Sequence, residues 1–163
     1  MKIKKYIVII FIILICGLCI FCPKTKVQPF RLVVGGTMST TESVVFDVYS
    51  NGFVSVKEFI GRAGNLKNDD FISDVLDKKR ILLNNSDRKF INESIREIVK
   101  SNTLGGYDVG GCNIHILIDE QIYSSTFSFE DYQRSDKSII GLTYRLMELA
   151  KMDTATWGRQ TVD

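Results

Sequence analysis

The sequence is poor in the residues that most catalytic and metal sites require. It has a single histidine, His115, and four cysteines, three of which lie in one apolar run near the N-terminus. A structural zinc site takes four ligands, mostly cysteine and histidine, and a serine hydrolase of the Gly-x-Ser-x-Gly type takes a histidine base; neither pattern occurs. The sequence offers no catalytic, metal-binding or cofactor-binding constellation, so we expect a protein that is not an enzyme and needs no cofactor.

Cysteine is also scarce in the body of the chain, where Cys112 stands alone. Cys112 and His115 form a Cys-x-x-His pair, but residues three apart on a strand point to opposite faces and cannot share a metal ion or act as nucleophile and base. No disulfide can form within the body, whose fold must depend on its hydrophobic core. That property fits a bacterial cell envelope better than the disulfide-rich secreted domains of animals.

Proline and excess charge are lacking as well. The chain of 163 residues has two prolines, a net charge of +2 and 45% hydrophobic residues. These values exclude a disordered chain, a collagen-like rod and a strongly basic nucleic-acid-binding protein. The glycine-rich segment 105–111 lacks the lysine of a phosphate-binding loop and precedes a predicted strand, so it indicates a flexible turn.

A long apolar run is the strongest feature that the sequence does contain. Residues 6–22 carry no charge, and 16 of these 17 residues are hydrophobic. As a helix the run is about 25 Å long, at the short end of what spans a bilayer. We expect a transmembrane anchor at 6–22, a lysine-rich cytoplasmic tail at 1–5 and a tether at 23–29, with the lipid bilayer as the partner of the anchor.

Two alternatives for this leader are less favoured. A cleaved signal peptide has a shorter apolar core and small residues before the cut, and the one passable site, Gly17-Leu18-Cys19, lies inside the run. A lipid-anchored cysteine follows a small residue, whereas Cys16, Cys19 and Cys22 follow Ile, Leu and Phe. Lysines flank the run on both sides, so the orientation is nearly balanced; the signal-like position favours the N-terminus inside and the body outside.

The first part of the body reads as three strands. Residues 30–38, 42–50 and 53–60 are rich in β-branched and aromatic side chains. Asn51-Gly52 separates the second run from the third, and this dipeptide is the strongest short-range hairpin signal because both residues tolerate positive φ. We predict a three-stranded antiparallel meander.

The next segments are predicted from helical spacing. Residues 70–79 fit a short helix with Phe71, Val75 and Leu76 on one side, and 80–83 fits an edge strand. A longer helix is expected to be capped by Asn85 or Ser86 and to end near Asn102, with Phe90, Ile91, Ile95, Ile98 and Val99 as its apolar stripe.

The last part of the body repeats the order of a hairpin followed by a helix. Residues 112–119 and 122–129 alternate as strands around a predicted turn at Glu120-Gln121, and 138–152 has helical spacing. The predicted fold is α+β: an N-terminal transmembrane helix, then a small antiparallel sheet of about five strands in hairpin-helix-hairpin-helix order, packed against two helices. The domain covers 30–152, and a polar tail follows at 153–163.

These features favour a single-pass protein of the cell membrane with an extracytoplasmic domain that binds an envelope protein or peptide. An unpaired sheet edge can accept such a peptide by strand addition, and neither a nucleic acid nor a small-molecule ligand is inferred. Two alternatives stay open. One is an envelope hydrolase whose carboxylates or Cys112 assemble only in the fold, and the other is a membrane subunit with a cytoplasmic body.

Overall fold

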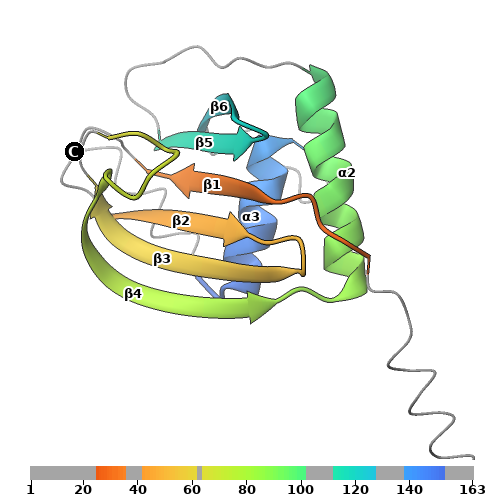
Figure 1. Cartoon of the computed structure of the whole chain (residues 1–163), viewed down its shortest axis with the longest axis horizontal. Helices are drawn as coiled ribbons and strands as arrows, with labels where there is room; N and C mark the ends of the chain where they lie inside the picture. Colours follow the sequence, from red (N-terminus) through yellow and green to blue (C-terminus); the bar gives the residue numbers. More distant parts are fainter. Residues whose placement is uncertain (1–24, 36–41, 62–63, 102–111, 128–137, 153–163) are drawn as a thin grey trace, which may run out of the picture.

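The computed structural model describes residues 25–35, 42–61, 64–101, 112–127 and 138–152. These ranges contain six strands and two helices: β1 (Phe30–Val34), β2 (Glu42–Val48), β3 (Phe53–Gly61), β4 (Ile72–Leu82), α2 (Asn85–Ser101), β5 (Cys112–Ile118), β6 (Gln121–Phe127) and α3 (Ile139–Leu149). The strands form one antiparallel sheet in the order β4-β3-β2-β1-β5-β6 (Figure 1). The α+β class is confirmed, with six strands where the sequence predicts about five.

The leader and the tail lie outside this description. The cytoplasmic tail predicted at 1–5, the anchor predicted at 6–22, the glycine-rich segment 105–111 and the tail at 153–163 are not among the described residues. Within the described ranges, no helix has both the length and the apolar character needed to cross a membrane.

The predicted meander is confirmed, although its hairpin turn differs. Strands β1, β2 and β3 are neighbours, and Leu32, Phe46 and Val56 face one another across them. The turn is wider than a two-residue Asn-Gly turn, because the Tyr49 N–H donates to the Phe53 carbonyl (2.9 Å). Only Gly52 of this turn has a positive φ, +83°, as in a three-residue loop that ends in a glycine bulge.

The second hairpin is confirmed with its turn one residue earlier than predicted. Asp119 and Glu120 both have positive φ (45° and 68°), the conformation that matches the right-handed twist of a two-residue hairpin. Strand β6 therefore begins at Gln121, and every cross-strand neighbour of β5 shifts relative to the predicted pairing.

The short helix predicted at 70–79 is wrong. Residues 72–82 instead form β4, which pairs with β3. Strand β4 includes residues 80–82 of the edge strand predicted at 80–83. Phe71 is buried just before this strand, whereas Val75 and Leu76 are exposed. Because most side chains of this edge strand are exposed, they do not alternate between buried and exposed, and pairing with β3 overrides the local helical pattern.

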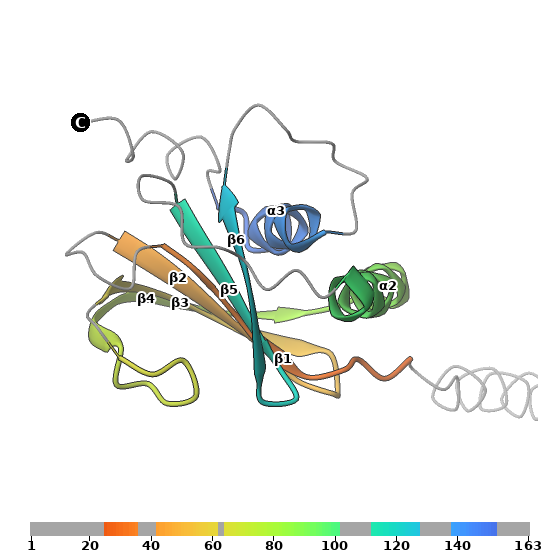
Figure 2. The ribbon, with the colours of Figure 1, turned by 90° about the horizontal axis from the view of Figure 1, so that it is seen from above.

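Both helices cover the same face of the sheet (Figure 2). The main core lies between the helices and this face of the sheet. It includes Ile91 and Ile95 of α2, Leu142 and Leu146 of α3, and Phe46 of β2. The N-terminal cap of α2 is Asn84, one residue before the predicted cap, since its Oδ1 accepts from the Asp87 N–H (2.8 Å). Helix α3 is capped by Ser138 and ends at Leu149, three residues before the predicted end.

The other face of the sheet is partly covered by the loop 64–71 (Figure 2). Leu66 and Phe71 of this loop pack with Val33, Val45 and Phe59 in a smaller core. The rings of Phe59 and Phe71 meet edge to face with centroids 5.3 Å apart, a favourable aromatic geometry. We call this the outer face, because the helices leave it open.

Candidate functional site

The free edge of β4 is the feature that best fits the predicted peptide-binding site. In the described part of the chain, β4 and β6 are the two edge strands of the sheet, and β4 is the longer, with 11 residues against 7. Strands β4 and β3 pair through Phe53 and Leu82, and the Leu83 N–H donates to the Gly52 carbonyl (2.9 Å). In an antiparallel ladder this bond marks Phe53 and Leu82 as a non-hydrogen-bonded pair.

The same register decides which backbone groups of β4 face away from the sheet. Alternate residues bond to opposite sides, so the N–H and C=O groups of Lys78, Arg80 and Leu82 point outward. The outward N–H of Lys78 is occupied, because it donates to the Asp77 carboxylate (2.8 Å). Those of Arg80 and Leu82 have no partner among the described residues, and they present the donors that an added strand would use.

Two cationic side chains lie along this edge on the outer face. Lys78 and Arg80 stand at alternate positions, opposite Lys57 and Ser55 of β3, and neither has an ion-pair partner in the described ranges. Their neighbour Lys79 points to the other face, where its Nζ pairs with Glu58 (3.0 Å) and Asp77 (3.4 Å). The hydrogen bond that Lys79 donates to the Glu58 carboxylate raises the pKa of Lys79.

A shallow depression adjoins the Leu82 end of the edge. It has a volume of about 220 Å³ and is lined by Tyr49, Phe53, Val54, Ser55 and Arg80. The exposed Phe53 and Leu82 are cross-strand partners. The edge of β4 therefore combines free backbone groups, two unpaired cations and apolar surface within one short stretch.

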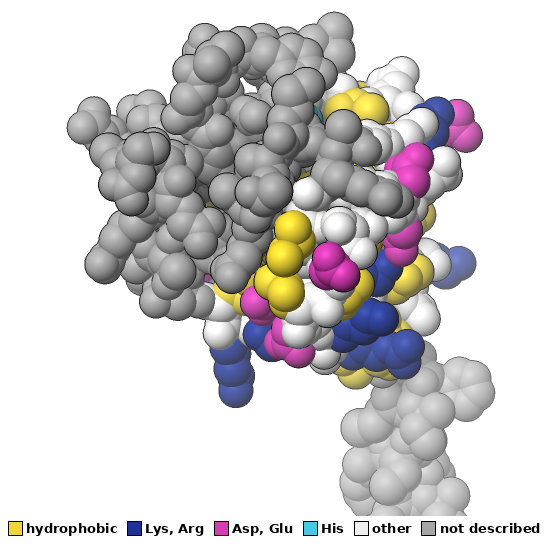
Figure 3. Space-filling view, turned by 90° about the vertical axis from the view of Figure 1, so that its left-hand side faces the viewer, with side chains coloured by type: hydrophobic (Ala, Val, Ile, Leu, Met, Phe, Trp, Pro, Cys, Tyr) yellow, Lys and Arg dark blue, Asp and Glu magenta, His cyan; other side chains and the backbone are white. Residues whose placement is uncertain are grey.

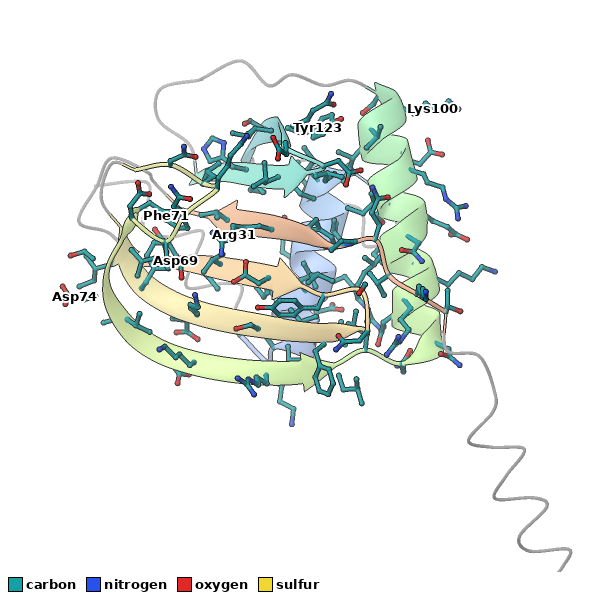
Figure 4. All side chains as sticks on the ribbon, in the orientation of Figure 1. Arg31, Asp69, Phe71, Asp74, Lys100 and Tyr123 are labelled. Carbon is teal, nitrogen blue, oxygen red and sulfur yellow. The ribbon has the colours of Figure 1, made fainter. Side chains whose placement is uncertain are left out.

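A second depression lies between α2 and the β5–β6 hairpin, and some of its polar groups bond to one another. It encloses about 430 Å³, and Lys100 and Tyr123, both labelled in Figure 4, are among the residues that line it. The Gln28 Nε2 donates to Asp119 (2.9 Å), and the Tyr123 hydroxyl donates to Gln121 (2.8 Å). Arg96 and Lys100 of α2 also line this depression, but β4 offers the longer strand edge for an added peptide.

A network of four charges occupies the centre of the outer face. The Arg31 guanidinium contacts Asp47 (2.6 Å) and Asp69 (2.9 Å), and Lys57 also contacts Asp69 (2.6 Å). Figure 4 shows Arg31, Asp69 and Phe71 together in front of the sheet. The hydrogen bond from Lys57 and the nearby Arg31 lower the pKa of Asp69.

This charge network fastens the loop 64–71 to the sheet. Arg31 also donates to the carbonyls of Leu66 (3.1 Å) and Asn68 (3.2 Å). Two cations and two carboxylates balance one another, so the arrangement holds a loop in place. No local pattern in the sequence relates Asp69 to Arg31, which lies 38 residues earlier.

His115 forms a pair that sequence reasoning missed. Its Nδ1 lies 2.7 Å from the hydroxyl of Ser124, the residue opposite it on β6. Burial lowers the pKa of His115, and its Nε2 is buried with no partner among the described residues. A serine–histidine catalytic pair is oriented by a third group, and no described carboxylate bonds to this ring.

The backbone register keeps Cys112 away from this pair. Cys112 lies opposite Phe127 and His115 lies opposite Ser124, so the two residues are three positions apart along β5. Among the residues that the structure describes, no group of three or more His, Cys, Asp or Glu could hold a metal ion.

Comparisons with known proteins add no relative. No protein-family model matches the sequence, and no curated protein matches it either.

Proposed function

We propose that this chain is a non-enzymatic, single-pass membrane protein of the bacterial cell envelope whose domain lies outside the cell and binds an extended peptide. The peptide adds to β4 as a seventh strand. The observation that carries this proposal is the outward-facing backbone of Arg80 and Leu82, whose N–H groups have no partner among the described residues. The membrane location rests on the apolar run 6–22.

The side chains of the edge define the chemistry of the peptide. Lys78, Arg80 and Leu82 share the outer face of β4 at alternate positions. A paired strand places its own alternate residues opposite them. An antiparallel strand runs opposite to β4, so the best partner carries an apolar residue followed by acidic residues two and four positions later.

Binding of a synthetic peptide to the full-length chain in lipid nanodiscs tests this proposal. The peptide has a leucine followed by glutamates two and four positions later, and a matched peptide has lysines in place of the glutamates. We expect saturable binding of the glutamate peptide and slower hydrogen exchange at the amides of Arg80 and Leu82. Equal binding of both peptides, or protection confined to β6, would show that the site is elsewhere.

The Leu82→Pro variant separates strand addition from side-chain contact. Proline removes an outward N–H, which edge strands tolerate, and Leu82→Ala removes the side chain while keeping the N–H. We expect Leu82→Pro to abolish binding and Leu82→Ala to weaken it only modestly. Unchanged binding by a folded Leu82→Pro protein refutes strand addition at β4.

Topology is tested with a reporter fused after Asp163. A reporter that is active only outside the cytoplasm will be active if the body is extracytoplasmic. Activity of a cytoplasm-only reporter at the same position would instead support the membrane subunit with a cytoplasmic body.

A further inference from the structure

The chain enters the described domain through a segment that is firmly bonded to it. Arg88 Nη1 donates to the Thr25 carbonyl (3.1 Å), and the Val27 N–H donates to the Ser50 carbonyl (3.2 Å). Asn92 of α2 donates to the Lys26 carbonyl (2.7 Å) and accepts from the Gln28 N–H (3.0 Å). Although 23–29 is expected as a tether, the part from Thr25 onward is attached to the body.

This attachment leaves very little chain between the domain and the apolar run. Only Pro23 and Lys24 separate residue 22 from Thr25, and the three steps from residue 22 to Thr25 span at most about 11 Å. If 6–22 spans the bilayer, as the proposed function holds, the end of the domain that carries Thr25 lies at the level of the lipid headgroups.

Two exposed aromatic residues lie at this end of the domain. Tyr49 and Phe53 are 50% and 46% exposed, and they flank the turn whose Asn51 carbonyl accepts from Arg88 (2.8 Å). The same guanidinium binds Thr25, so the turn and the point of chain entry are neighbours. We call Tyr49 and Phe53 the turn patch.

Two exposed lysines lie beside the turn patch, and the exposed acids Asp119 and Glu120 lie at the same end of the sheet in the β5–β6 turn. Lys26 lies in the bonded entry segment, and Lys89 lies one turn before Asn92, which holds that segment. The acid in the first turn of α2, Asp87, is buried and paired with Arg145 (2.6 Å). The opposite end of the sheet carries exposed acids as well: Figure 4 places Asp74 there, and Figure 3 shows acidic and basic side chains interspersed on it.

We propose that the turn patch rests in the headgroup region of an anionic bilayer, with Lys26 and Lys89 contacting lipid phosphates. This inference rests on the membrane anchor of the proposed function. Amphipathic aromatic rings concentrate at the membrane interface, and basic residues within a Debye length of an anionic surface are attracted to it. The contact fixes the tilt of the domain and turns the Leu82 end of the β4 edge toward the membrane.

Fluorescence quenching by brominated lipids measures this contact. The full-length chain carries Trp157→Phe to remove its only tryptophan, and a single reporter is introduced by Tyr49→Trp in vesicles of phosphatidylcholine and phosphatidylserine brominated near the headgroup. Leu76→Trp is the matched control, because Leu76 is also 50% exposed and lies toward the other end of β4. We expect roughly half of the fluorescence to be quenched with Tyr49→Trp and less than about a tenth with Leu76→Trp.

The outcomes separate this inference from the anchor itself. Flotation of the chain with the vesicles, together with an unquenched Tyr49→Trp reporter, overturns the docking of the turn patch while the anchor stands. Failure to float refutes the anchor. Lys26→Glu with Lys89→Glu is expected to reduce quenching in anionic vesicles, and Phe53→Trp provides a second reporter in case Tyr49→Trp perturbs the turn.

Discussion

The guanidinium of Arg88 lies 2.8 Å from the carbonyl oxygen of Asn51, inside the turn between β2 and β3. The same side chain donates to the carbonyls of Leu83 (3.0 Å) and Thr25 (3.1 Å). Arg88 is only 2% exposed, so one buried cation joins three segments that are distant in sequence. Buried polar groups are expensive unless they are bonded, which makes this junction sensitive to substitution.

Gly52→Ala is expected to destabilise the domain through this junction. Gly52 has a φ of +83°, and a Cβ built there would fall 2.2 Å from the Arg88 guanidinium. Backbone strain and the displaced arginine together should lower the free energy of unfolding by about 2 kcal/mol. Urea denaturation of the variant measures this loss, with the exposed Ser50→Ala as the control that should stay near the parent.

Arg88→Ala should be more harmful, because three carbonyls lose their donor. We expect a loss of about 3 kcal/mol in the free energy of unfolding. In the Arg88→Ala background, Gly52→Ala should cost less than in the parent, because the clash is gone and only the positive φ remains. Additive costs in this double-mutant cycle would show that the two residues do not act through each other.

Removal of Arg31 is expected to release the loop 64–71. Arg31→Met keeps the length of the aliphatic part of the side chain but removes the charge. Asp47, which is 12% exposed, then lacks its closest cation. Loss of one partner of a largely buried ion pair costs several kcal/mol, so we expect a fall of about 3 kcal/mol and faster hydrogen exchange in 64–71. Lys67→Met is the control, because its pair with Glu120 is exposed on both sides. Unchanged exchange in the loop would show that its apolar contacts alone hold it.

Stability should depend on pH through His115. Burial lowers the pKa of His115, so the unfolded chain binds its proton at a higher pH than the folded chain does. Stability is therefore fully present above the unfolded pKa of about 6.5 and falls as the pH drops from there toward the folded pKa. Chemical denaturation between pH 7.5 and about pH 5 should show this fall in the parent and a flatter profile in His115→Gln. The pKa of Asp69 is lowered, so its contribution to stability is lost only as the pH falls below the ordinary carboxylate pKa of about 3.9. The effects of His115 and Asp69 on stability therefore occur at different pH.

The sequence allowed the buried elements to be predicted because burial produces periodicity. Strands β1 to β3 and the stripe of α2 carry apolar side chains at the spacing of the face they cover. Strand β4 has mostly exposed side chains, so its pattern suggested a helix, and only its pairing with β3 determines its conformation. The edge strand predicted at 80–83 therefore covered only the last three residues of β4, and the rest of this edge was not located from the sequence.

Small errors in register also hid side-chain partners. A turn at Glu120-Gln121 would place Thr126 opposite His115, whereas the observed turn places Ser124 there. A shift of one residue in the turn thus changes every pair across the hairpin. The contacts of Arg31 with Asp69 and of Arg88 with Thr25 join distant segments, and no local pattern encodes such pairs.

The last prediction concerns the two cations of the β4 edge. Lys78→Gln and Arg80→Gln each remove a charge that faces the acidic peptide, and an opposite-charge cross-strand pair contributes roughly 0.2–1 kcal/mol. We expect each variant to raise the Kd of the glutamate peptide about threefold. Lys79→Gln is the matched control, because Lys79 points to the other face and pairs with Glu58; its Kd should stay near that of the parent.

A salt series separates binding by charge from binding by the backbone. At high salt the contribution of Lys78 and Arg80 to peptide affinity should shrink, and the contribution of the backbone hydrogen bonds should persist. A larger effect from Lys79→Gln than from Lys78→Gln would place the peptide on the helix side of β4 and refute the proposed register.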